Sequence, residues 1–352
     1  MLPALLAVAI CLSPLQDPPL KQVWKVEMDD LILGSPVVHR DQTFVASRRG
    51  KVGAFNTETG ASGWTGSADA GVISTPAALK DGLFIPTGLS GSILNFGTGK
   101  RRPGSIGRAV RVHRGESRLY LLGGIDFDGT YQLGSTDFVN CLDVETGRLS
   151  WKSDWGVAPV GAIAESGGKL YLAGLETVFI LDAKTGKEAG SWNHPATQKM
   201  LHGVTDRDRV IFQGDWEPAT CYEVKERKEL WRWSRGPESG QGVIPPVVVQ
   251  GLVILSMLPE VVGLDSKSGA ERWKQKLEAK AEFSQLPPAV RGKEVCIGAN
   301  GKLFALDHQT GKVQWTLEVV KPDESFLAHQ PVWSGDRLLY ACGKTLYCYK
   351  PK

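Results

Sequence analysis

The sequence contains little of what most catalytic and metal-binding sites require. Its 352 residues include six cysteines and six histidines. No C-x-x-C or C-x-x-C-H pattern occurs among them, so neither a zinc knuckle nor covalently bound haem is supported. The histidines follow no shared spacing, and the chain has no nucleophile-elbow serine and no phosphate-binding glycine loop. The formal net charge of only +3 argues against a general nucleic-acid binder.

Long apolar runs are also scarce. The clearest one, from Met1 to about Leu15, is ended by a Pro-Pro pair and is too short to span a membrane. It resembles the apolar region of a secretory signal. We therefore predict a signal peptide at residues 1–16, a single domain at residues 17–352, and export to the periplasm or extracellular space of a bacterial-type cell. Cys11 would permit a lipid anchor, although a bulky Ile precedes it where such signals require a small residue.

The chain does contain a repeated phrase. Its best copy runs from Asp307 to Trp315 and reads Asp-His-Gln-Thr-Gly-Lys-Val-Gln-Trp. Further copies are Asp265–Trp273, Asp143–Trp151 and, with Asn in the first place, Asn56–Trp64. The repeat tryptophans are Trp24, Trp64, Trp151, Trp192, Trp231, Trp273 and Trp315. Consecutive ones are separated by 39 to 42 residues, except for one gap of 87 between Trp64 and Trp151. A period of about forty residues is typical of a solenoid or a propeller.

The spacing predicts eight units. The 87-residue gap holds two of them, and the hidden one keeps Thr98-Gly99 but lacks both the Asp and the Trp. A last, partial unit from Gln330 to Lys352 lacks its Trp strand, which Gln22–Val26 at the other end of the chain can supply. Closing a ring in this way protects sheet edges, and short strands alternate with Gly, Asp and Asn turns. We predict an all-β fold almost without helices: an eight-bladed β-propeller of four-stranded antiparallel blades, closed by the N-terminal strand.

The repeated residues have structural roles in this interpretation. The Asp accepts hydrogen bonds from its turn, the Gly provides a positive φ, and the Trp packs between neighbouring blades. Besides the seven tryptophans, the residues given these roles are Asp143, Asp182, Asp265, Asp307, Gly60, Gly147, Gly186, Gly269 and Gly311. Two units are degenerate, since one reaches Trp192 with two extra residues and another has lost Thr-Gly before Trp231. Cys141, Cys221 and Cys348 occupy a slot that holds Ala or Gly elsewhere, so we interpret them as structural.

The run Leu-Phe-Ala-Leu-Asp-x-x-Thr-Gly-x-x-x-Trp at Leu303–Trp315 resembles the pyrroloquinoline-quinone-type (PQQ-like) propeller repeat, and the resemblance covers nearly the whole chain. That repeat family contains periplasmic quinone-dependent dehydrogenases and non-catalytic propellers, among them a lipoprotein that helps to assemble outer-membrane barrels. The dehydrogenases carry adjacent cysteines under the quinone, a calcium site of Glu, Asn and Asp, and long roofing loops. This chain has no adjacent cysteines and little length to spare, so the resemblance implies neither a catalytic residue nor bound PQQ or Ca²⁺.

One insertion, in the third unit, is a weak candidate for a metal site. Asp126, Asp128 and Asp137 have the spacing of calcium-loop ligands, and Ca²⁺ prefers six to eight oxygen ligands. Asp137, however, is shorter than the Glu usual at the twelfth position. A solvated hairpin extension is the alternative interpretation.

Two further sets of residues are candidates for partner contacts. Basic residues gather after the second unit, at Arg101, Arg102, Arg108, Arg111 and Arg114. They could dock an acidic protein, a phosphate or an anionic glycan, or form a solvated edge. Trp155 and Trp216 lie in connections beside carboxylates, where an exposed indole can anchor a partner.

These observations favour binding over catalysis. We predict an exported, monomeric scaffold without a cofactor, which binds a protein or peptide partner in the cell envelope and touches the membrane only through partners or a lipid anchor. Two alternatives remain open. One is a small quinone-type oxidoreductase or sugar-active enzyme with its site at the central funnel, and the other is a sensor of a small ligand.

Overall fold

The computed structural model describes most of the chain. The described residues are 19–87, 91–103, 111–115, 117–122, 138–154, 162–174, 176–194, 200–214, 219–234, 244–279, 286–320 and 329–352. Within these ranges every regular element is a β-strand. Accordingly, no helix long and apolar enough to cross a membrane is found in these ranges.

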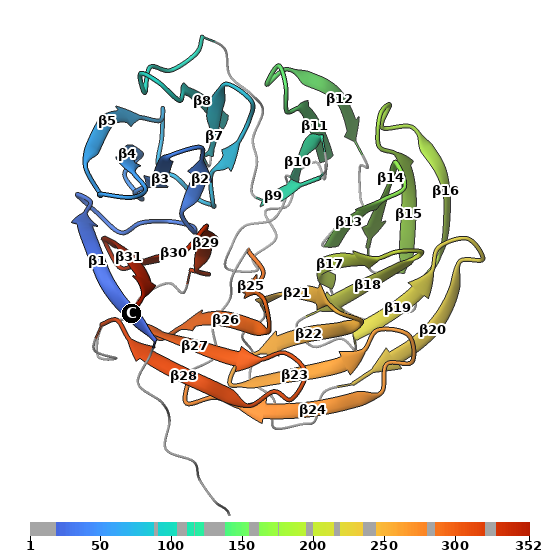
Figure 1. Ribbon diagram of the computed structural model, residues 1–352. Coiled ribbons are helices and arrows are strands. Elements are labelled where there is room, and N and C mark those ends of the chain that lie inside the picture. The colour runs from blue at the N-terminus through green and yellow to red at the C-terminus, as the bar shows by residue number, and fades with distance from the viewer. Residues whose placement is uncertain are drawn as a thin grey trace, which may run out of the picture.

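The strands of the described residues form eight sheets arranged as the blades of a ring (Figure 1). Blades 1 to 4 contain, in order, β2 (Val37–His39), β3 (Gln42–Ala46), β4 (Lys51–Asn56) and β5 (Ser62–Ser67); β6 (Ala77–Ala78), β7 (Gly82–Pro86) and β8 (Gly91–Asn95); β9 (Arg111–Arg114), β10 (Arg118–Leu122), β11 (Phe138–Asp143) and β12 (Leu149–Asp154); and β13 (Ala162–Ser166), β14 (Lys169–Ala173), β15 (Thr177–Asp182) and β16 (Glu188–Asn193). Blades 5 to 8 contain β17 (Met200–Asp206), β18 (Arg209–Gly214), β19 (Ala219–Glu223) and β20 (Lys228–Trp233); β21 (Ile244–Val249), β22 (Leu252–Met257), β23 (Glu260–Asp265) and β24 (Glu271–Lys276); β25 (Ala289–Arg291), β26 (Glu294–Ala299), β27 (Lys302–Asp307) and β28 (Val313–Glu318); and β29 (Val332–Ser334), β30 (Arg337–Cys342), β31 (Thr345–Pro351) and β1 (Leu20–Glu27).

Both ends of the chain meet in blade 8. Its strand order is β1-β31-β30-β29, and β1 pairs with β31 from Leu20 opposite Pro351 to Glu27 opposite Thr345. The predicted eight-bladed ring closed by the N-terminal strand is thus confirmed. Blade 2 departs from the other blades because its sheet has three strands, with an isolated bridge between Leu94 and Arg101 in place of a fourth.

The ring is also closed at its inner side, where blade 8 meets the segment that leads into blade 1. The imidazole Nε2 of His329 donates a hydrogen bond to the carbonyl of Ile32 at 2.7 Å. The backbone N–H of Gln330 donates to the hydroxyl of Ser35 at 2.9 Å. Both bonds join residues separated by almost the whole chain.

The repeated turn joins the third and fourth strands of a blade. After β27, one carboxylate oxygen of Asp307 accepts the backbone N–H groups of Gln309 and Thr310 and the Thr310 hydroxyl, at 2.9 to 3.0 Å. Gly311 then adopts a φ of +70°, which glycine reaches without the steric strain of a Cβ. The same pattern of bonds occurs at Asn56, Asp182 and Asp265. Hydrogen bonds from the backbone of Thr146 lower the pKa of the equivalent Asp143.

The second unit keeps this turn around Thr98-Gly99, although it lacks the Asp. Asn95 takes the place of the Asp, and its Oδ1 accepts the N–H groups of Gly97 and Thr98 and the Thr98 hydroxyl. An amide oxygen satisfies the same donors as a carboxylate oxygen, so the turn survives the change. Only the Trp of this unit is missing, and Pro103 stands in its place.

Five of the seven repeat tryptophans join their blade to the next one. Trp273 of blade 6 donates from Nε1 to the carbonyl of His308 in blade 7 at 2.8 Å, and its indole covers Gly311. The equivalent pairs are Trp24 on Gly60, Trp64 on Gly99, Trp151 on Gly186 and Trp231 on Gly269. The residue opposite each of these indoles on the neighbouring strand is small. Gly263 faces Trp273, and a Cβ there would lie 2.3 Å from the ring.

Two repeat tryptophans behave differently. Trp192 pairs with Val178 rather than with the residue in the repeat slot, because two extra residues displace it along β16, and Gly190 occupies the slot instead. Arg227, at the turn-glycine position of blade 5, has a φ of +57° and covers Gly190 with its guanidinium group. Trp315 has no repeat turn ahead of it, because blade 8 ends there in the chain termini, and its Nε1 donates to Glu294 within its own blade.

Eight clusters of buried apolar side chains lie between the blades, one at each contact between consecutive blades. For example, Val45 of blade 1 packs with Leu339 of blade 8. The hydrophobic stabilisation is therefore spread around the whole ring. Each blade depends on both of its neighbours to bury its faces.

Candidate functional site

Two of the turns of each blade lie at the same end of the ring, which we call the turn face. The turn between the first and second strands lies there together with the repeated Asp turn, because successive strands are antiparallel. The residue after the repeat Asp or Asn, here called the seam residue, is fixed by its backbone. The N–H of Ser266 donates to the carbonyl of Gly251, and that of His308 to the carbonyl of Lys293, each at 2.9 Å.

Seam residues with large side chains contact the preceding blade. His308 of blade 7 places Nε2 at 3.2 Å from the Oε1 of Gln250 in blade 6. Phe96 of blade 2 stacks on His39 of blade 1, with ring centroids 4.1 Å apart. The size and polarity of the seam residue therefore influence what occupies the space between two blades.

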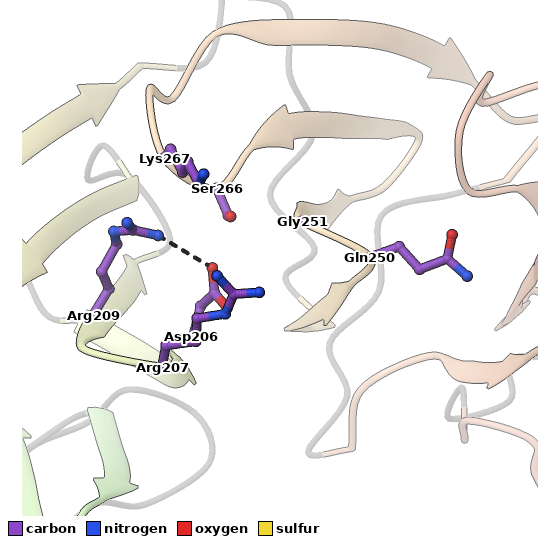
Figure 2. Close-up of a pocket in the computed structure, with 7 residues that line it drawn as sticks. All are labelled: Asp206, Arg207, Arg209, Gln250, Gly251, Ser266 and Lys267. Carbon is purple, nitrogen blue, oxygen red and sulfur yellow. Dashed lines mark hydrogen bonds and ion pairs between the residues drawn. The ribbon is translucent and has the colours of Figure 1, made fainter.

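A cavity of about 300 Å³ opens between blades 5 and 6, where the seam residue is the short Ser266 (Figure 2). It is lined by Asp206, Arg207, Arg209, Gln250, Gly251, Ser266 and Lys267, and we call it the 5/6 groove. Figure 2 shows the Ser266 hydroxyl directed into the groove and the Gln250 side chain directed away from it. Ser266 is only 2% exposed, and its hydroxyl has no hydrogen-bond partner among the described residues.

The 5/6 groove has an excess of positive charge. Arg207, Arg209 and Lys267 face one lining carboxylate, that of Asp206. The guanidinium group of Arg209 lies 3.5 Å from Asp206 and 4.0 Å from Asp208, which is longer than a strong charge-assisted hydrogen bond of about 2.7–2.9 Å. The Nε of Arg209 is buried and has no hydrogen-bond partner in the described chain.

A second cavity, of about 630 Å³, occupies the corresponding place between blades 1 and 2. Its lining includes the stacked pair His39 and Phe96 and several charged residues. Two of its cations are already engaged. Lys80 pairs with Glu145 at 2.6 Å, and Arg102 donates to the carbonyl of Asp81 at 2.8 Å.

The basic residues predicted to form one patch are distributed over different parts of the fold. Arg101 lies at the outer position of blade 2, where it pairs with Asp69. Arg114 ends β9, at the other edge of its sheet in blade 3, and donates to the carbonyl of Ala78.

The remaining basic candidates do not restore a single patch. Arg102 lines the cavity between blades 1 and 2, and Arg111 begins β9. Arg108 lies outside the described residues. The role of these residues in partner binding stays a prediction.

Several other candidates also lie outside the described residues. These are the weak calcium candidates Asp126, Asp128 and Asp137, the loop tryptophans Trp155 and Trp216, and the predicted signal peptide at residues 1–16. Within the described ranges no three His, Cys, Asp or Glu side chains are grouped in a way that could hold a metal ion.

The cysteines in the described ranges are all buried and unbridged. Burial raises the pKa of the Cys141, Cys221 and Cys296 thiols to about 12 and that of Cys348 to about 11. Because the thiolate is the nucleophile, burial and the raised pKa both disfavour reaction of these four thiols near neutral pH. Cys141, Cys221 and Cys348 each lie opposite a repeat indole on the neighbouring strand, which agrees with a structural role.

Sequence reasoning did not single out the 5/6 groove. Ser266, Arg209 and Lys267 are ordinary residues for exposed turns, and no motif marks them. Ser266 directly follows the repeat residue Asp265, but the same position holds Thr57 and Ala183 in other repeats. A short side chain there is therefore not a distinctive signal.

A family model described as outer membrane protein assembly factor BamB matches residues 17–101, 135–248 and 216–352. One curated relative, outer membrane protein assembly factor BamB of Burkholderia pseudomallei (strain K96243), is 25% identical over 230 residues. That alignment covers 60% of this chain and 58% of the relative, so the chain matches less than two thirds of the relative's length.

Solved structures share the fold at low sequence identity. BamB from Moraxella catarrhalis superposes with a TM-score of 0.67 at 14% identity, over 94% of this chain and 99% of that one. A quinohemoprotein alcohol dehydrogenase from Comamonas testosteroni gives a TM-score of 0.71 at 13% identity, over 94% of this chain and 76% of that one. Both an assembly factor and an enzyme thus share this architecture, and the fold alone does not decide between the two.

Proposed function

Because the chain belongs to the family described as outer membrane protein assembly factor BamB, we propose that it is a non-catalytic propeller that binds protein partners in the cell envelope and supports outer-membrane protein assembly. The family match extends over most of the chain, and the curated relative carries the same description. In this proposal the protein is exported and acts as a monomer. It requires neither PQQ nor Ca²⁺, and it reaches the membrane through its partners or a lipid anchor.

The observation that best supports this proposal is that the repeated residues have structural roles. The Asp and Gly residues form turns, and five of the seven repeat tryptophans are held against the next blade. The most distinctive residues of the chain are therefore occupied by the fold itself. What remains accessible at the described turn face is a set of charged and polar grooves, and such surfaces suit recognition of another protein.

The proposal is tested by deleting the gene in the source organism and measuring the amount of folded outer-membrane proteins. We expect a reduced amount, restored by a plasmid copy of the wild-type gene. A copy lacking β1 (Leu20–Glu27) should fail to restore it, because the ring is then open. Unchanged outer-membrane proteins in the deletion strain would contradict the proposal.

A tagged copy provides the second readout. It should fractionate with the cell envelope, where the proposed partners are. Recovery in the cytosol alone would contradict the export that the proposal requires.

A further inference from the structure

We propose that the 5/6 groove binds an Asp or Glu side chain from an acidic segment of a protein partner. The inference rests on the proposed function for the presence of such a partner. It adds the place on the ring and the chemistry that is recognised. Four features of the groove lead to it: an open space, a hydroxyl without a partner among the described residues, an incompletely paired guanidinium group and an excess of cations.

The seam position of this groove holds a short side chain. Between blades 6 and 7, His308 extends from the seam position to Gln250. Between blades 5 and 6, Ser266 occupies the same position and is too short to make such a contact. The 5/6 groove is therefore the place where a side chain from another molecule can take the position that His308 occupies in the next seam.

The polar groups in the groove are suited to a carboxylate. The Ser266 hydroxyl can donate one hydrogen bond, and it lines the groove on a residue that is otherwise almost entirely buried. A carboxylate oxygen would accept from this hydroxyl, and the guanidinium group of Arg209, whose buried Nε has no partner in the described chain, would contribute positive charge beside it.

The charges favour an anion over a neutral side chain. Arg207 and Lys267 are exposed at the rim, and neither side chain has a partner among the described residues. Arg209, deeper in the groove, is held by carboxylates only at 3.5 and 4.0 Å. An incoming carboxylate would therefore meet three cations and one carboxylate of the lining, that of Asp206.

The cavity between blades 1 and 2 is larger but fits this ligand less well. Phe96 fills its seam position, and Lys80 and Arg102 already hold Glu145 and the Asp81 carbonyl. Its lining also includes two carboxylates, Asp41 and Asp81. The 5/6 groove has the stronger uncompensated positive charge in a smaller space.

The test uses the purified full-length chain and a fluorescein-labelled peptide, Gly-Glu-Ser-Glu-Gly, with anisotropy as the readout at low salt. The same peptide with both Glu replaced by Gln is the ligand control. We expect the Glu peptide to bind and the Gln peptide to bind at least about tenfold more weakly, because the latter has lost both negative charges. Absence of binding by the Glu peptide, or equal binding by both peptides, would overturn the proposal.

Protein variants locate the binding on the ring. Lys267→Gln should weaken binding of the Glu peptide about fivefold, and Ser266→Ala about threefold, as expected for loss of one charged or one neutral contact. Lys225→Gln is the matched control. Lys225 stands at the same turn position in blade 5, two residues after Glu223 as Lys267 stands two after Asp265, and its loss should leave binding within about twofold of the wild type. An equal loss with Lys225→Gln would mean general electrostatic attraction and would overturn the assignment to this groove.

Competition with inorganic phosphate shows whether the groove binds a carboxylate side chain or a free oxyanion. At equal ionic strength, phosphate should displace the Glu peptide no better than chloride does, because the groove is proposed to recognise a carboxylate. Stronger displacement by phosphate would reassign the groove to a free oxyanion. Since these binding measurements use no cells, they can succeed or fail independently of the outer-membrane measurement.

Discussion

Trp273 lies on Gly311 of the next blade so closely that a Cβ added to the glycine would stand 2.3 Å from Cε3 of the indole. The same glycine has a φ of +70°. Two independent constraints, one steric and one conformational, therefore act at one residue. This pair of residues shows how a turn signal and an aromatic signal, 38 positions apart in the sequence, form one structural unit.

Gly311→Ala should destabilise the protein by several kcal/mol, because the new methyl group must displace the indole in addition to straining the backbone. Gly292→Ala is the matched control. Gly292 has a φ of +58°, but no atom lies within 4 Å of its Cβ position, so only the backbone term of about 1–2 kcal/mol applies. Denaturant titration of both variants measures the difference, and equal destabilisation would show that the indole does not constrain the turn.

Trp273→Ala should lower the free energy of unfolding by roughly 3–5 kcal/mol, the usual range for truncating a buried aromatic residue. The indole contributes apolar contacts and the hydrogen bond to His308. Leu230→Ala, in an outer strand, removes a side chain that is 41% exposed and should change stability by less than about 0.5 kcal/mol. A loss below about 1 kcal/mol for Trp273→Ala would mean that the indole is available for binding.

Deletion of residues 1–26 should lower the melting temperature far more than deletion of residues 1–18. The longer deletion removes most of β1, including Trp24, and leaves β31 as an unpaired edge. The shorter deletion stops before β1. Thermal melts of the two truncated proteins give the comparison, and equal melting temperatures would contradict closure by the N-terminal strand.

The stability of the fold should fall as the pH is lowered from about 6.5 to about 4, in part because of His329. Burial lowers the pKa of His329 to about 4 from an ordinary value of 6.5, so the unfolded chain binds the proton more readily over this range. The loss from one such group is at most about 3 kcal/mol. His329→Asn, which keeps a side-chain N–H donor, should show a smaller decrease between pH 7 and pH 4.5 in urea titrations. An identical decrease in wild type and variant would mean that His329 does not contribute.

The sequence was sufficient to predict the architecture because the repeat consists of residues with distinctive chemistry. Asp and Gly at fixed spacing identify a turn, and the Trp that follows identifies the indole that covers the turn of the next blade. The incomplete unit at the C-terminus indicates the role of Leu20–Glu27. The exceptions arise from substitutions that preserve the geometry with other atoms. Asn95 replaces a carboxylate with an amide, and Arg227 covers Gly190 where an indole covers a glycine elsewhere.

The candidate groove could not be predicted in the same way. It depends on three segments, at Asp206–Arg209, Gln250–Gly251 and Ser266–Lys267, that are distant in the sequence and carry no motif. The short side chain of Ser266 occupies the seam position of the groove. A small side chain at this position of the repeat does not mark a binding site in the sequence. The packing of blade 5 against blade 6 brings the cations and the hydroxyl together.

The central claim is that this propeller binds protein partners and does not perform quinone chemistry. The most direct test is to titrate the purified protein with PQQ and Ca²⁺ and to follow the melting temperature, the quinone absorbance and the reduction of a redox dye with alcohols and sugars. A ligand at 100 times its dissociation constant would stabilise the protein by about 2.7 kcal/mol, which a thermal melt detects readily. We predict no shift, no change in absorbance and no dye reduction. A stabilised protein that reduces the dye would contradict the account and identify the chain as an oxidoreductase.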